Sequence, residues 1–76
     1  MHDLSPTQVR NICNTILAEN DFEKLRSLFM IVDNDKITSL ISFKKKNSSE
    51  LKSVTIDTID IEEFKNKLKK EISLIV

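Results

Sequence analysis

The sixteen residues LFMIVDNDKITSLISF, positions 28–43, decide the fold class of this chain. Five apolar residues at 28–32 precede the polar cluster DND at 33–35, and a short apolar run that ends in such a cluster is typical of a strand entering a turn. Residues 37–43 then alternate apolar and polar side chains, as a strand with one buried face does. The stretch predicts two strands joined by a hairpin, because both the shortness of the run at 28–32 and the polar cluster after it favour a strand there over the alternative, a buried helix.

The residues after this hairpin predict a third strand. Positions 44–50 are polar, which indicates a loop, and residues 51–58 alternate again with Val54 and Ile56 on one face. The three runs together predict a three-stranded antiparallel meander.

Helices are predicted before and after the meander. Ser5 and Gln8 have the S-x-x-Q spacing of a capping box, which starts a helix over residues 6–19. Asp60 and Glu63 have the same spacing at the start of a last helix. A short helical stretch is also expected after Asp21, which can act as its N-cap.

We therefore expect a small α+β fold that forms a single domain over residues 1–76. An N-terminal helix and the short helix precede the three-stranded antiparallel meander, and a C-terminal helix follows it. Both long helices should lie on one face of the sheet, because their apolar stripes need a common core. A chain of 76 residues can build only one modest core.

The absence of glycine excludes several kinds of catalytic and cofactor site. Phosphate loops, dinucleotide-binding turns and nucleophile elbows all need glycine where the backbone approaches a ligand or makes a strained turn. A domain of this size also has little room for a deep substrate cleft. We therefore expect no enzyme activity, no catalytic residues and no cofactor.

The residues that commonly bind metal ions are too few for a site. The cluster at 33–35 resembles the start of a calcium loop, but the positions that should hold a glycine and a glutamate hold Thr38 and Lys44. His2 and Cys13 are the only histidine and cysteine, whereas a structural zinc site needs four ligands. We expect no metal site, and we expect Cys13 to be an inert apolar side chain of the first helix.

Cysteine content and the N-terminal sequence favour a cytoplasmic protein that does not enter a membrane. A single cysteine cannot form an intramolecular disulfide, and small secreted domains usually depend on several. The first residues lack the basic and apolar regions of a signal peptide, and the longest apolar run has five residues. Ten isoleucines, ten lysines and six asparagines fit the coding bias of an AT-rich bacterium, phage or mobile element.

Lysines gather at one place, although twelve basic and twelve acidic residues balance over the chain. Four of them surround the loop between the second and third strands: Lys44, Lys45, Lys46 and Lys52. Such a patch can bind the phosphate backbone of a nucleic acid. The interpretation that we favour is a solvated loop that keeps a sheet edge from pairing, because no Trp, Tyr or Arg lies nearby to contact bases.

The sequence also contains more apolar side chains than two helices on one sheet face can cover. The candidates for exposure lie on the predicted strands and at the apolar end of the chain: Phe29, Ile31, Leu40, Leu51, Leu74 and Val76. An exposed apolar patch usually marks a surface for a partner or for self-association. The alternative is that the short helix or the C-terminal tail folds over these residues.

The function that the sequence favours is a small non-catalytic module that docks on another protein. An inhibitor, an immunity protein or a regulatory accessory factor of bacterial or phage type would fit. The alternative is a nucleic-acid-binding module that uses the lysine-rich loop, and a homodimer that buries the sheet face or the C-terminal tail is compatible with either function. The salt dependence of binding distinguishes protein docking from nucleic-acid binding, because phosphate binding weakens steeply as the salt concentration rises.

Overall fold

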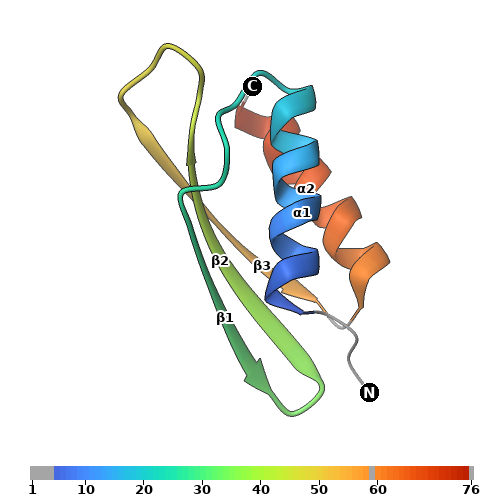
Figure 1. Ribbon diagram of the computed structural model, residues 1–76. Helices are drawn as coiled ribbons and strands as arrows, with labels where there is room; N and C mark the ends of the chain where they lie inside the picture. Colours follow the sequence, from blue (N-terminus) through green and yellow to red (C-terminus); the bar gives the residue numbers. More distant parts are fainter. Residues whose placement is uncertain (1–4, 59, 76) are drawn as a thin grey trace.

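The computed structural model describes residues 5–58 and 60–75. Two helices and three strands follow one another as α1 (Pro6–Glu19), β1 (Ser27–Asp33), β2 (Lys36–Lys44), β3 (Leu51–Thr58) and α2 (Ile61–Ile75). The strands form one antiparallel sheet in the order β1-β2-β3, and both helices lie on the same side of it (Figure 1). The predicted α+β fold with its meander is confirmed, and residues 28–32 are a strand rather than a helix.

The central strand β2 decides which face of the sheet is buried. Its alternate residues that face the helices are at most 1% exposed: Ile37, Ser39, Ile41 and Phe43. Val54 and Ile56 of β3 lie beside them on the same face. The helices complete this core with their apolar stripes, which supply Val9, Cys13, Ile16 and Leu17 from α1 and Phe64, Leu68 and Ile72 from α2.

Both long helices begin at the predicted caps. The backbone N–H of Gln8 donates to Ser5 Oγ at 3.2 Å, and the N–H of Ser5 donates to Gln8 Oε1 at 3.2 Å. The N–H of Glu63 donates to Asp60 Oδ1 at 2.8 Å. These bonds satisfy N–H groups that the first turn of a helix leaves without an intrahelical partner.

The short helix expected after Asp21 is absent, because residues 21–26 form an extended connection. The backbone N–H of Glu23 donates to the carbonyl of Lys44 at 2.8 Å, and that of Arg26 donates to the carbonyl of Ser42 at 2.7 Å. These N–H groups are therefore bonded to the end of β2 and are not free to form a helical turn. Phe22 fixes the connection further, since its ring packs edge-on against Phe43 with 5.1 Å between the centroids.

Three residues take the left-handed conformation that glycine would normally supply. Asp21 has φ 67°, Asn34 has φ 57° and Asn47 has φ 66°. Asp and Asn tolerate this region better than other residues with a side chain, because their short polar groups can hydrogen-bond locally. Asn34 opens the two-residue turn between the paired residues Asp33 and Lys36, so the β1–β2 hairpin depends on it.

Asn34→Ala is expected to lower the free energy of unfolding by about 1 kcal/mol, because alanine has a Cβ but no polar group to support positive φ. Asn34→Gly should leave that free energy unchanged or raise it, because glycine takes positive φ without a steric penalty. Urea denaturation followed by circular dichroism measures both variants against the parent chain. If both variants lose the same free energy of unfolding, contacts of the Asn34 side chain stabilise the turn, and the ease with which residue 34 takes positive φ does not.

Candidate functional site

The face of the sheet that points away from the helices, here called the outer face, carries a group of exposed apolar side chains. Phe29 on β1 pairs with Leu40 on β2, and Ile31 is the next outward residue along β1. Their exposed fractions are 67% for Phe29, 57% for Ile31 and 40% for Leu40. Because these three residues are neighbours in the sheet register, they form one contiguous surface, which we call the outer patch.

The outer patch is exposed because both helices of the described residues, α1 and α2, lie on the opposite face of the sheet (Figure 1). The extended connection at 21–26 bonds to the end of β2 and to the residue that follows it, at Ser42, Lys44 and Lys45. The alternative that a short helix after Asp21 covers these residues is therefore wrong.

Polar groups border the outer patch along the strands. On one side, the Thr38 hydroxyl donates to Asp57 Oδ1 at 2.8 Å, and Lys36 Nζ lies 3.4 Å from Asp57 Oδ2. The hydrogen bond from Thr38 and the charge of Lys36 lower the pKa of the Asp57 carboxyl below its ordinary value. On the other side, the hydroxyls of Ser42 and Ser53 are 3.3 Å apart. An apolar centre with a polar rim is the usual composition of a protein–protein interface.

The other predicted interface residues lie apart from the outer patch. Leu51 is 55% exposed on the outer face, but it pairs with Lys44 four positions along β3 from Thr55, the partner of Leu40. At about 3.4 Å per residue this places it about 14 Å along the strand from the patch. Leu74 is 70% exposed and belongs to α2, on the other side of the sheet. Val76 lies outside the described residues.

Val32 is an exposed apolar residue that the sequence analysis did not select. It is on the helix-facing side of β1, as Leu28 and Met30 are, yet it is 64% exposed. Leu28 and Met30 pack partly against the core, whereas Val32 lies on the edge strand and stays exposed although Ile37, its partner on the central strand, is only 1% exposed. No local pattern in the sequence distinguishes Val32 from a buried strand residue, because its exposure depends on which strand lies at the edge of the sheet.

The four lysines of the predicted nucleic-acid site do not share one face. Lys44 pairs with Leu51 and points to the outer face, whereas Lys52 pairs with Phe43 and lies on the helix side. Two of these lysines also form ion pairs with carboxylates: Lys52 Nζ is 2.9 Å from Glu50, and Lys46 Nζ is 4.0 Å from Asp21. Exposed pairs of this kind are weak, but they reduce the positive charge offered to a phosphate backbone. The nucleic-acid site stays a prediction.

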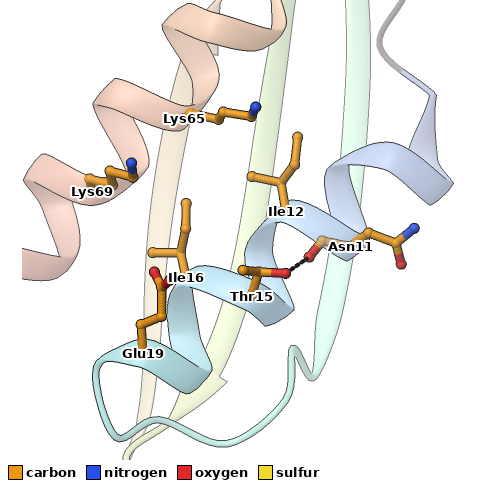
Figure 2. Close-up of a pocket in the computed structure, with 7 residues that line it drawn as sticks. All are labelled: Asn11, Ile12, Thr15, Ile16, Glu19, Lys65 and Lys69. Carbon is orange, nitrogen blue, oxygen red and sulfur yellow. Dashed lines mark hydrogen bonds between the residues drawn. The ribbon is translucent and has the colours of Figure 1, made fainter.

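An open groove of about 350 Å³ lies between the two helices (Figure 2). Its lining consists of Asn11, Ile12, Thr15, Ile16 and Glu19 from α1 and of Lys65 and Lys69 from α2. Ile12 and Ile16 point toward α2, and the Lys65 side chain reaches toward Ile12 (Figure 2). Lys65 Nζ is 3.5 Å from Glu62, and Thr15 donates to the Asn11 carbonyl at 3.0 Å. Among the described residues, its lining includes no thiol, imidazole or pair of carboxylates that would give the groove acid–base or nucleophilic chemistry.

Cys13 is fully buried in the core between the helices and the sheet. Burial raises the pKa of its thiol from the ordinary 9.0 to about 12. A thiol that stays protonated at neutral pH is a poor nucleophile and a poor metal ligand. Within residues 5–58 and 60–75, no three His, Cys, Asp or Glu side chains come together as metal ligands would.

The free energy of unfolding should fall as pH rises from about 9 toward about 12, because the unfolded thiol ionises in this range while the folded thiol keeps its proton. Urea titrations at pH 8 and pH 10.5 measure this loss. The control is Cys13→Ala, whose stability should depend less on pH than that of the parent. An identical pH dependence of the two chains would contradict a raised thiol pKa.

Two hydroxyls are buried on the helix-facing side of the sheet without a hydrogen-bond partner in the described part of the chain. They are Ser39 Oγ and Thr58 Oγ1, on neighbouring strands. A buried polar group without a partner costs about 1–3 kcal/mol, and replacing it by an apolar group of the same shape removes that cost.

Thr58→Val is therefore expected to keep the free energy of unfolding or to raise it by up to about 1 kcal/mol. Thr55→Val, on the solvent-exposed outer face of the same strand, is the matched control and should change the free energy less. Thermal and urea unfolding measure both variants. A clear loss of stability in Thr58→Val alone would mean that the hydroxyl has a partner in the folded protein.

No helix in the described ranges is both long enough and apolar enough to cross a membrane. Comparisons of the chain with protein-family models, with curated proteins and with solved structures find no match. The interpretation of the outer patch therefore rests on its own geometry.

Proposed function

We propose that this protein is a small non-catalytic module that docks on another protein through the outer patch. The observation that supports this function is the contiguous exposure of Phe29, Ile31 and Leu40 on a sheet face that no helix or strand within residues 5–58 and 60–75 covers. Large exposed apolar side chains that adjoin one another typically mark an interaction surface, whereas scattered ones do not. An inhibitor, an immunity protein or a regulatory accessory factor of a bacterium or phage is the class of protein we infer.

The backbone beneath the outer patch favours docking of a preformed surface. Leu40 belongs to the central strand, which is bonded to a strand on each side, and the opposite face of that strand is packed in the core. A surface that is already ordered loses little conformational entropy when a partner binds. Phe29 is the only aromatic residue exposed on this face in the described chain, and central aromatic residues commonly dominate the binding energy of an interface.

The lysine-rich loop supports the alternative function, a nucleic-acid-binding module, less well. Its lysines point to both faces of the sheet, and two of them are next to carboxylates. The experiment below separates the two functions, because contacts with phosphates respond to salt and to nuclease and apolar docking does not.

Leu40→Lys is expected to weaken partner binding about 30-fold or more, because it places a charge at the centre of the apolar surface. The measurement is capture of the partner on the immobilised protein from a lysate of its native host, with nuclease treatment, at low and high salt. Titration of the captured partner against parent and variant then gives the affinity ratio.

The matched control is Leu74→Lys, which makes the same change at an exposed leucine of α2 outside the patch. It should bind the partner as the parent does. Capture that disappears with nuclease or at high salt, and that is lost on changing Lys44, Lys45 and Lys46 to Glu, would contradict the proposal and favour nucleic-acid binding.

A further inference from the structure

β1 is an edge strand without the usual protection against pairing with another chain. Within the described residues its only strand partner is β2, so one row of its backbone N–H and C=O groups faces outward. Natural edge strands are commonly blunted by lysine, by proline or by a bulge. β1 reads SLFMIVD, pairs with β2 residue by residue over its whole length, and has one charged residue, Asp33, at its end.

We propose that β1 pairs antiparallel with β1 of a second copy of this chain, so that two three-stranded sheets join into one of six strands. Such a contact is isologous, because the same strand serves on both sides of a two-fold axis perpendicular to the sheet. Both pairs of helices then lie on one side, and the two outer patches lie side by side on the other. The proposal concerns the edge of the sheet and does not depend on which protein binds the outer patch.

The register of this pairing follows from the two faces of β1. Residues directly opposite each other in an antiparallel pair lie on the same face, so odd positions must meet odd positions and even positions must meet even ones. Met30 is the middle residue of Ser27–Asp33, and placing Met30 opposite Met30 of the second copy pairs all seven residues. In this register Phe29 meets Ile31 of the second copy, and both side chains are exposed on the outer face of the single chain.

On the helix side, the same register covers the apolar residue that the chain's own helices leave exposed. Val32 is 64% exposed, whereas Leu28 is partly buried against the core. Val32 of each copy would stand opposite Leu28 of the other, which packing already holds in place. The two-fold symmetry places apolar residues of β1 opposite apolar residues of the second copy on both faces of the sheet. For this reason we prefer a second copy to a strand of an unrelated protein.

Charge favours the antiparallel direction. A parallel arrangement would place Asp33 of the two copies side by side, and like charges opposite each other destabilise a sheet. The antiparallel arrangement places Asp33 opposite Ser27 of the second copy and next to Arg26. The Arg26 guanidinium lies 3.8 Å from Glu23 of its own chain, and because the Arg26 side chain is 54% exposed it can also approach a carboxylate of the other copy.

Sedimentation of the intact protein tests the dimer. Contact through one short strand is small, so we expect a concentration-dependent equilibrium between monomer and dimer between about 5 µM and 500 µM. Ile31→Lys should keep the chain monomeric at the top of this range, whereas Leu74→Lys should dimerise as the parent does. Circular dichroism confirms that both variants are folded. A parent chain that stays monomeric throughout, or an Ile31→Lys variant that still dimerises, would overturn the proposal.

Disulfide formation tests the register. In Met30→Cys, the two new cysteines face each other at the two-fold axis with Cα atoms about 4.5–5.5 Å apart, within the range of a disulfide. Most of this variant should oxidise to a covalent dimer, and Leu74→Cys, the control for random collision, should not. Cys13 can stay in place, because it is buried and its thiol is not ionised.

Phe29→Cys should not cross-link with itself, but an equimolar mixture of Phe29→Cys and Ile31→Cys should form the mixed disulfide, which mass spectrometry distinguishes. Preferential self-linkage of Phe29→Cys, or no excess of Met30→Cys dimer over Leu74→Cys dimer, would overturn the proposal. Leu40→Lys, on the central strand, should weaken partner binding and still form the dimer. The docking function and the β1 dimer can therefore be tested, and contradicted, independently of each other.

Discussion

The one-sided apolar pattern of the central strand is the constraint on which the rest of this structure depends. β2 presents Ile37, Ile41 and Phe43 to the helices and polar or exposed side chains to the opposite face. Because its neighbours pair with it in register, their buried and exposed faces are set by the same alternation. Both helices must then lie on one side, where their apolar stripes meet this face, and the outer face stays open to solvent.

The chain ties its connections to the sheet without using glycine. Asp21, Asn34 and Asn47 supply the left-handed residues of the bends, and Phe22 holds the connection at 21–26 against the end of β2. Backbone bonds from Glu23 and Arg26 replace the ones that a helix would have made. These attachments keep the segment close to the core, so that it does not reach the outer patch.

The outer patch and the edge of β1 are two different candidate interaction surfaces on one small sheet. The patch belongs to two strands and offers side chains, whereas the edge offers backbone hydrogen bonds along a single strand. If both are used, the second copy covers the edge and doubles the face that a partner would meet. Such an arrangement would provide a domain of this size with a docking surface larger than its own sheet can supply.

The helix at 6–19, the strand at 51–58 and the alternation at 37–43 can be predicted from the amino-acid sequence, because capping boxes and period-two patterns are local signals. The same patterns also select Phe29, Ile31 and Leu40 as candidates for exposure. Other features depend on contacts between residues far apart in the chain. The stretch 21–26 has a helical cap, yet its hydrogen-bond partners lie about twenty residues away on β2. Val32 has the face of a core residue, but it lies on an edge strand and stays exposed beside the buried Ile37, and no local pattern encodes which strand lies at the edge.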